Sequence, residues 1–457
     1  MKRAVISILG LVGHTQRKPY VVDGEIKYRI ESKDESDKAL YYFDNDLKRR
    51  LSPLKREKYF NMLPLVIENF EGYEQACIYT RLSLKNQQAL LDYENITFNI
   101  KENGLFISEE STDEEAEYAY FLDEINKLIQ KYDRVIVDMT HGFRHLPILA
   151  IINLIIQNIQ DSEKIEAILF AKEIKQYKEY EIIDLKEYLE LANLSSMLSS
   201  FNQNYTVSSN IHFSNGLYQE LAEELNEFSH HFLSNSLKPL IEGEIIENII
   251  DNLEVLQTKK SVENFKEYIE EIKEHLEDIR QLKHENEWIR LYKLSKMMDE
   301  RGYQLNAITL LFEAVGLYCL NSLSQMEILE KQVKKYREYI ARNKQPLHIY
   351  SLYTMTNQSR VIVKIKERFK VGDGRLFINS EEMKNTIVKY LETVENLSSF
   401  KSFIEDLEAL RNNLAHGNSG FTLEDVKSIY KRDRKRFEKF TMEENIFKNA
   451  KDFKGKD

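Results

Sequence analysis

The stretch RVIVDMTHGFR, residues 134–144, decides the fold of the N-terminal part of this chain. Its first half, residues 134–139, is rich in β-branched and apolar residues, which is typical of a strand buried on both faces of a parallel sheet. A glycine turn follows, and residues 145–157 have the apolar pattern of a helix. A strand, a turn and a helix in this order predict one unit of an α/β domain.

Polar residues cluster at the point where this strand ends. Thr140, His141 and Arg144 contribute a hydroxyl, an imidazole and a guanidinium, and Gly142 permits a close approach of the backbone. Ligands of parallel sheets lie outside the carboxyl ends of the strands, and helix N-termini favour anions. We therefore expect a pocket for phosphates or ribose hydroxyls. A structural interpretation stays open, in which Asp138 and Thr140 cap the helix and His141 is a turn residue.

Strand and helix signals alternate through the first 185 residues and predict a parallel sheet with right-handed crossovers. An apolar run at residues 5–9 ends near Gly10 and Gly13, which places both glycines at the same sheet edge as Thr140. Further elements are predicted as short strands at 77–80, 96–100 and 167–171, a hairpin that turns at Asp23-Gly24, and a helix from Thr112 to about Lys131 with a capping box of Thr112 and Glu115. Neither a full dinucleotide fingerprint nor a phosphate-loop lysine is present, which disfavours a nicotinamide cofactor or NTP hydrolysis.

The pattern becomes helical from about residue 185. Residues 186–290 show no convincing strand, and residues 305–320 are the most apolar part of the helical half. A short β-like run at 360–365 is the exception. We therefore predict an α/β domain over 1–185, a helical connector over 186–290 and an all-α domain over 291–457.

Composition limits the class of protein. Apolar residues make up 42% of the chain and charged residues 30%, which suits a globular protein of two or three domains at 457 residues. A net charge of −11 argues against a protein that coats nucleic acid indiscriminately, although it permits a local basic site.

The cysteines indicate a cytoplasmic location. Cys77 and Cys319 both lie in apolar runs, and we expect buried thiols in a reducing compartment. No cysteine and histidine spacing typical of a metal site is present, so no metal is expected. The apolar stretch 146–156 is interrupted by Pro147 and Asn153 and is too short to cross a bilayer.

A second motif, RNNLAH at residues 411–416, has the residues that metal-free RNA cleavage needs. His416 can move a proton near neutral pH, and Arg411 can hold a phosphate with a permanently charged fork of donors. Five residues on an ideal α-helix correspond to about 140° around the axis and about 7.5 Å of rise, so the two side chains flank the helix. Two copies facing each other across a twofold axis would pool both pairs, which predicts a homodimer. Asn412 could orient the phosphate or the histidine.

Other basic residues compete with this interpretation. Arg342 and His348 also match an arginine and a histidine a few residues apart, but Pro346 would break a helix between them. The basic run 431–436 predicts local attraction for RNA phosphates, although an exposed helix end explains it nearly as well.

Both motifs resemble a known family. DMTHGFR at 138–144 resembles the nucleotide-pocket signature of CARF domains, the Rossmann-fold sensors associated with CRISPR systems. RNNLAH at 411–416 resembles the catalytic motif of HEPN ribonucleases. A sensor, a helical connector and a C-terminal HEPN domain follow one another in the ancillary ribonucleases of type III CRISPR systems.

The resemblance implies a function. A sensor dimer would bind a cyclic oligoadenylate and activate a HEPN dimer, which cleaves single-stranded RNA without a metal and leaves a 2′,3′-cyclic phosphate. No other cofactor is implied, and the THGFR-like turn indicates cyclic tetra-adenylate rather than the hexa-adenylate. The implied residues are Gly10, Gly13, Thr140, His141, Gly142 and Arg144 for the ligand, and Arg411, Asn412 and His416 for catalysis.

Two alternatives stay open. The chain could be a non-catalytic nucleotide-sensing regulator whose helical half recruits a partner. It could also be a sensor that degrades its cyclic oligoadenylate.

Overall fold

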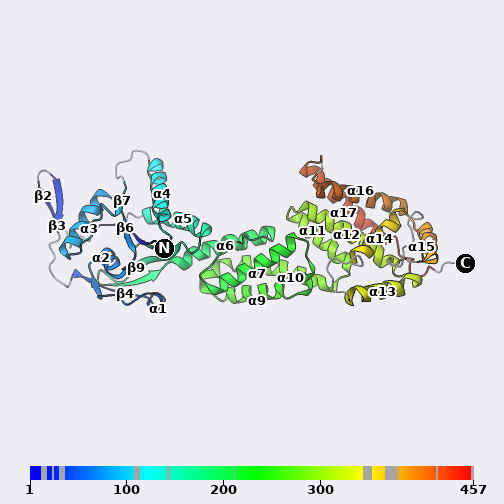
Figure 1. Ribbon diagram of the computed structural model, residues 1–457, viewed down its shortest axis with the longest axis horizontal. Helices are drawn as coiled ribbons and strands as arrows, with labels where there is room; N and C mark the ends of the chain where they lie inside the picture. Colours follow the sequence, from blue (N-terminus) through cyan, green and yellow to red (C-terminus); the bar gives the residue numbers. More distant parts are fainter. Residues whose placement is uncertain are drawn as a thin grey trace. The chain divides into compact units, whose positions relative to one another are not determined.

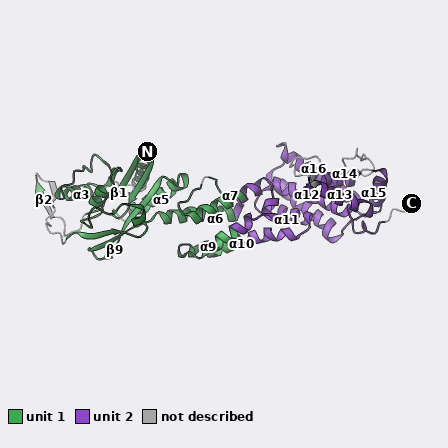
Figure 2. Cartoon of the chain, turned by 60° about the horizontal axis from the view of Figure 1, so that its bottom comes forward, with its two compact units in different colours: residues 1–202, 206–227, 249–270 green, residues 203–205, 228–248, 271–457 purple. Residues whose placement is uncertain are grey.

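A computed structural model describes most of the chain, namely residues 1–11, 18–22, 25–29, 37–107, 114–141, 145–209, 211–342, 352–365, 378, 380–417 and 420–453. These residues form two compact units (Figure 2). Unit 1 comprises residues 1–202, 206–227 and 249–270, and unit 2 comprises residues 203–205, 228–248 and 271–457. The three-part division expected from the sequence stays a prediction.

Unit 1 is built on a sheet of eight strands within the described residues, in the order β5-β4-β10-β9-β8-β1-β6-β7 (Figure 1). The five strands from β9 to β7 are mutually parallel. β10 runs antiparallel to β9, and β4 is parallel to β10. The strands are β1 (Arg3–Ile8), β4 (Ala39–Phe43), β5 (Lys58–Tyr59), β6 (Glu74–Tyr79), β7 (Gly104–Phe106), β8 (Arg134–Asp138), β9 (Ile165–Lys175) and β10 (Glu179–Asp184).

Apolar residues on both faces of the central strands explain why this sheet forms. Ile6 and Val137 belong to a core cluster shared with the helices α4 (Glu114–Gln130) and α5 (His145–Gln160). Val5 and Ile136, one residue away along each strand, point to the opposite face and join a second cluster with α1 (Leu47–Arg50) and α2 (Met62–Asn69). Successive strand residues point to opposite faces, so an uninterrupted apolar run requires a sheet that is covered on both sides.

Several predicted elements are confirmed. The strands at 5–9, 77–80 and 167–171 correspond to β1, β6 and β9, and residues 145–157 lie in α5. The hairpin pairs β2 (Lys18–Val22) with β3 (Glu25–Arg29) in antiparallel register, while its turn at residues 23–24 lies outside the described residues. Thr112, of the expected capping box, also lies outside them.

The predicted strand at 96–100 is wrong. Asn95 takes a left-handed backbone conformation, φ 57°, directly after α3 (Arg81–Tyr93). The side chain of Gln88 on that helix then accepts a hydrogen bond from the Ile100 N–H and donates one to the Phe98 carbonyl. A side chain thus takes the place of a neighbouring strand. The edge strand is instead β7, and the sequence interpretation also missed β10.

The rest of the described chain is helical, which confirms an α/β domain followed by helices. The β-like run at 360–365 is wrong, since it lies in α14 with Arg360 and Val363 buried. Beyond the sheet the elements are α6 (Lys186–Asn204), α7 (Gly216–Leu233), α8 (Lys238–Glu242), α9 (Ile245–Gln257), the 3-10 helix η3 (Lys260–Phe265), α10 (Lys266–Gln281), the 3-10 helix η4 (Leu282–His284), α11 (Glu287–Glu300), α12 (Gln304–Leu323), α13 (Glu327–Arg342), α14 (Leu352–Ile365), α15 (Glu381–Thr393), α16 (Leu397–Ala415), α17 (Leu423–Glu438) and the π-helix η6 (Lys439–Glu443).

The helix α12 organises unit 2. It packs against α11, α14, α16 and α17 (Figure 1). By length and composition it could cross a membrane, but 72% of its apolar window is buried inside the unit, which is typical of a core helix. Cys319 on α12 and Cys77 on β6 are both buried free thiols, as expected.

Candidate functional site

The carboxyl edge of the sheet gathers some of the expected ligand residues. β1 and β8 are adjacent and parallel, with Ser7 opposite Asp138, so Gly10 and Thr140 follow the two strands at the same edge. The Gly10 carbonyl accepts a hydrogen bond from the Gln87 side chain on α3 at 2.9 Å. Gly13, Gly142 and Arg144, which were also expected here, lie outside the described residues.

The buried Asp138 and the half-buried His141 form an interacting titratable pair at this edge. Asp138 is 2% exposed, and its Oδ1 accepts the Thr140 N–H at 3.0 Å. The Thr140 hydroxyl accepts the Ala171 N–H at 2.9 Å and so joins the end of β8 to β9. Burial raises the pKa of Asp138 and lowers that of His141. The Nε2 atom of His141 is buried without a hydrogen-bond partner, so a neutral imidazole has one ring nitrogen unused.

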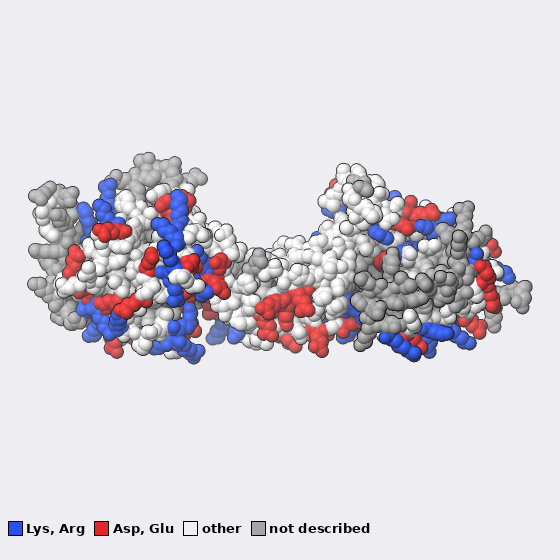
Figure 3. All heavy atoms as spheres, in the orientation of Figure 1, with Lys and Arg blue, Asp and Glu red and all other residues white. Residues whose placement is uncertain are grey.

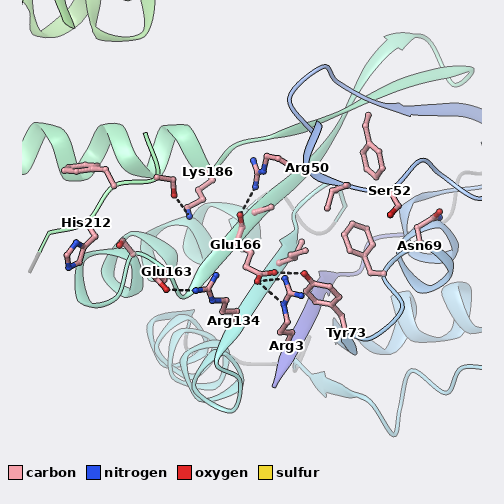
Figure 4. A pocket seen from close by; sticks show the side chains of 18 of the residues that line it. Arg3, Arg50, Ser52, Asn69, Tyr73, Arg134, Glu163, Glu166, Lys186 and His212 are labelled. Atoms are coloured by element: carbon pink, nitrogen blue, oxygen red, sulfur yellow. Dashed lines mark hydrogen bonds and ion pairs between the residues drawn. The ribbon is translucent and has the colours of Figure 1, made fainter. Parts of the chain in front are cut away.

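A cavity of about 730 Å³ lies at the opposite, amino edge of the sheet (Figure 4). The three arginines that line it all form ion pairs. Arg3 contacts Glu166 at 2.6 Å, and Arg134 pairs with Glu163. Arg50 contacts Asp184, next to the cavity, at 2.8 Å. These pairs balance the cavity's arginines, so we assign no anionic ligand to it. No sequence pattern indicates this cavity, since the ion pairs join residues more than 25 positions apart.

The helix α5, which follows the Thr140 turn, has an exposed apolar face. The side chains of Ile148, Ile152, Ile156 and Ile159 are 61%, 46%, 50% and 52% exposed. Their spacing of three or four residues places them along one side of the helix. Exposed apolar stripes of this kind are typical of interaction surfaces. The helical spacing of these isoleucines is visible in the sequence. The spacing alone does not show whether this side of the helix is exposed or buried.

The RNNLAH motif occupies the last turn of α16. His416 caps the helix, with its N–H bonded to the Asn412 carbonyl, and Gly417 ends it in the left-handed region at φ 67°. Arg411 is half-buried, whereas His416 is exposed. Both residues are described, and no hydrogen bond or ion pair between them is found. One chain therefore does not bring the two side chains together.

Arg411 lies against the core helix α12. Its Cζ is 4.7 Å from the centre of the Phe312 ring, and its Nε is buried without a hydrogen-bond partner. Burial raises the pKa of the neighbouring Glu313, while Arg360 and Arg411 lower it in part. The sequence interpretation missed these neighbours, since Phe312 looked like an ordinary core residue and Arg360 like part of a strand.

The basic run 431–436 lies within α17, and acidic residues pair with part of it. Arg436 contacts Asp406 at 2.8 Å and Asp433 at 3.4 Å. Arg432 contacts Asp433 at 2.9 Å. Two of its cations are therefore already engaged in ion pairs. RNA attraction by the run stays a prediction.

Other candidate groups can be placed in part. His348 of the competing arginine and histidine pair lies outside the described residues. His275 is half-buried, and its ring lies edge-on to that of Tyr205 with the ring centres 6.3 Å apart. Among the described residues, no three His, Cys, Asp or Glu side chains are grouped as a metal site requires.

Comparisons with known proteins add little. No protein-family model matches the chain, and no curated protein sequence matches it. Among solved structures, Enterococcus italicus Csm6 bound to cyclic hexa-2′-fluoro-hexa-dAMP aligns with 99% of this chain and 100% of its own, at 14% identity and a TM-score of 0.26. A superposition at this TM-score supports no argument, so the conclusions below rest on the residues of this chain.

The Asp138 and His141 pair predicts a pH dependence of stability. Because the folded-state pKa of Asp138 is raised, the contribution of Asp138 to stability is lost as the pH rises through its ordinary value of 3.8 toward neutrality. Asp138→Asn does not titrate. The melting temperature of the wild type minus that of D138N should therefore fall as the pH rises above 3.8, as followed by circular dichroism. A difference that stays constant over this range would contradict the burial of this carboxyl.

Proposed function

We propose that this chain is a cytoplasmic CARF–HEPN endoribonuclease of type III CRISPR antiviral defence, activated by a cyclic oligoadenylate. The main support for this proposal is how the side chains of Arg411 and His416 in the RNNLAH motif are placed. Arg411 is held against Phe312 and keeps an unpartnered Nε, while His416 is exposed at the end of the same helix. A buried guanidinium nitrogen with a purely structural role would instead be hydrogen-bonded by the surrounding protein.

The reaction is attack of an RNA 2′-hydroxyl on the adjacent phosphorus, which breaks the bond from phosphorus to the 5′-oxygen of the next nucleotide. The products are a 2′,3′-cyclic phosphate and a 5′-hydroxyl, which takes up the proton lost by the 2′-hydroxyl. His416 transfers the proton, and Arg411 stabilises the charge that develops on the phosphorane-like transition state. Asn412 orients the phosphate or the imidazole. No metal is required because the nucleophile belongs to the substrate and no water has to be activated.

The active form is a homodimer. Arg411 and His416 do not meet within one chain, so a twofold seam that pools both pairs supplies the missing groups. The exposed isoleucine face of α5 provides a second surface for self-association, in unit 1. Because α5 follows the Thr140 turn directly, pairing through this face would bring two ligand edges toward one another and match a twofold cyclic ligand.

The activator is a cyclic oligoadenylate, with cyclic tetra-adenylate preferred over the six-membered ring. Gly10, Thr140 and His141 contribute to its pocket from the described edge, and Gly13, Gly142 and Arg144 complete the set. The unpartnered His141 Nε2 favours this assignment, since a ligand group can satisfy it. Activation requires that the ligand bind the active arrangement more tightly than the resting one. The helices of residues 186–290 transmit the change.

His416→Ala should lower RNA cleavage by at least about 100-fold, which is the lower end of general acid–base contributions. The dimer should persist, because the exposed face of α5 provides a second surface for self-association. Single-turnover cleavage of labelled RNA measures the effect. His230→Ala, at an exposed position of α7, is the matched control and should leave the rate unchanged. Full activity of the His416 variant would rule out this active site.

Incubation of labelled single-stranded RNA with the protein, EDTA and each cyclic oligoadenylate in turn tests class and activator together. We expect cleavage with cyclic tetra-adenylate and little with the other rings. A regulator without catalytic activity would bind one ring and leave the RNA intact. Turnover of the ring itself, followed by chromatography of the nucleotide, would reveal a sensor that degrades its activator.

Ile152→Glu with Ile156→Glu should weaken self-association, because both residues are exposed on the apolar face of α5 and a buried charge at a dimer seam is costly. Light scattering after gel filtration should show a shift toward monomer, with more activator needed for cleavage. Val255→Glu, 49% exposed on α9, is the control. An unchanged mass and activation curve would show that α5 is not a dimer surface.

A further inference from the structure

We infer that Phe312 and Arg360 are positioning residues for RNA cleavage, forming a platform in the helical core that orients the Arg411 guanidinium. The inference rests on the proposed ribonuclease function and deepens it. Neither residue belongs to the RNNLAH motif, and neither needs to touch RNA. Both act through Arg411.

Two guanidinium groups lie over the same aromatic ring. The Cζ of Arg360 is 3.5 Å from the centre of the Phe312 ring, and the Cζ of Arg411 is 4.7 Å from it. Phe312 is 1% exposed. A cation over a desolvated aromatic face is attracted by the ring quadrupole, typically by about 0.5–2 kcal/mol. The ring therefore fixes where the Arg411 side chain lies, while α16 fixes only its backbone.

The two arginines differ in how their donors are used. Arg360 is 2% exposed, donates to the Phe312 carbonyl at 3.1 Å and to Asn357 Oδ1 at 2.9 Å, and lies 3.9 Å from Glu313. Arg411 makes no ion pair or hydrogen bond within the described chain, and its Nε is buried and unpartnered. Arg360 is therefore a structural cation whose donors are engaged, and Arg411 keeps its donors for a phosphate.

The surrounding packing is built to hold Arg360 in place. A Cβ on Gly316, one turn after Phe312, would overlap Thr356 and come within 3.0 Å of Arg360 Nη1. Only glycine thus allows α14 to approach α12 closely enough for the stack. Lys364 on α14 contacts Glu408 on α16 at 2.5 Å, one turn along from Arg360 and from Arg411 respectively. This bridge sets the register between the two arginine-bearing helices.

Glu313 completes the charge arrangement. It follows Phe312 on α12, and its carboxyl group interacts electrostatically with both arginines. Two cations over one ring would repel each other without a compensating negative charge. The carboxylate offsets this repulsion without forming a close ion pair with Arg411, and so leaves the guanidinium available to the substrate.

Fluorination of Phe312 tests the platform. Site-specific incorporation of mono-, di- and trifluorinated phenylalanine keeps the ring shape and progressively weakens its attraction for cations. We expect kcat to fall stepwise, to about a tenth of the wild-type value for the trifluorinated protein, with KM little changed. A ring that only fills space would give the same kcat throughout the series, and this result would overturn the inference.

Chemical rescue provides a second readout. Guanidinium ion at non-denaturing concentration should restore part of the activity lost in Arg411→Ala, because the platform can seat the free cation. Rescue should be lost when Phe312→Leu or Arg360→Met is added. Equal rescue in all three proteins would overturn the platform. Arg337→Met, which removes an ion pair with Glu287 of 2.8 Å elsewhere in unit 2, is the control and should not affect rescue.

Failure of the inference can be told apart from failure of the proposed function. If the Arg411→Ala protein cleaves RNA as fast as the wild type in the presence of activator, the proposed active site is ruled out. If the Arg411→Ala protein is inactive but the fluorinated proteins keep the full kcat, only the proposed role of Phe312 and Arg360 is ruled out.

Discussion

Burial of apolar side chains on both faces of β1 and β8 is the constraint on which unit 1 depends. In the observed register Ile6 lies opposite Val137 and Ser7 lies opposite Asp138. That register places the ends of the two strands side by side. The polar residues after each strand therefore lie at one edge of the sheet because of apolar packing.

The same logic applies to unit 2, with a helix in place of strands. α12 is apolar nearly all round, so α14 and α16 are drawn against it, and each brings one arginine to the ring of Phe312. Once α16 is docked in this way, its last turn must point Arg411 inward and His416 outward. A single chain thus separates the two groups that the proposed chemistry needs. Their separation argues for a shared active site between two chains more strongly than the motif does by itself.

The sequence was sufficient where a local pattern has one structural solution. The strand at 134–139, the glycine-terminated strand at 5–9 and the change to helices near residue 185 all follow from periodicity. Prediction from the sequence failed where contacts between distant residues decide the local structure. Residues 96–100 have strand propensity, but the Gln88 side chain takes their hydrogen bonds. Four of the six residues 360–365 are β-branched, yet docking against α12 makes the segment a helix. Of the candidate site, the motif residues could be named, while Phe312 and Arg360 could not, because nothing along the chain joins positions 312, 360 and 411.

Electrostatics explain how an acidic protein could act on RNA. The chain carries a net charge of −11, and Figure 3 shows acidic side chains gathered over α9. Part of the basic surface is also neutralised internally, as Arg436 shows with Asp406 and Asp433. A protein of this kind gains little from non-specific phosphate contacts, whose strength depends on the number of cations that are free to bind. Recognition of RNA must then depend on a few cationic side chains that are already oriented for binding. A buried ring satisfies this need well, since it orients a guanidinium and, unlike a carboxylate, takes none of its hydrogen-bond donors.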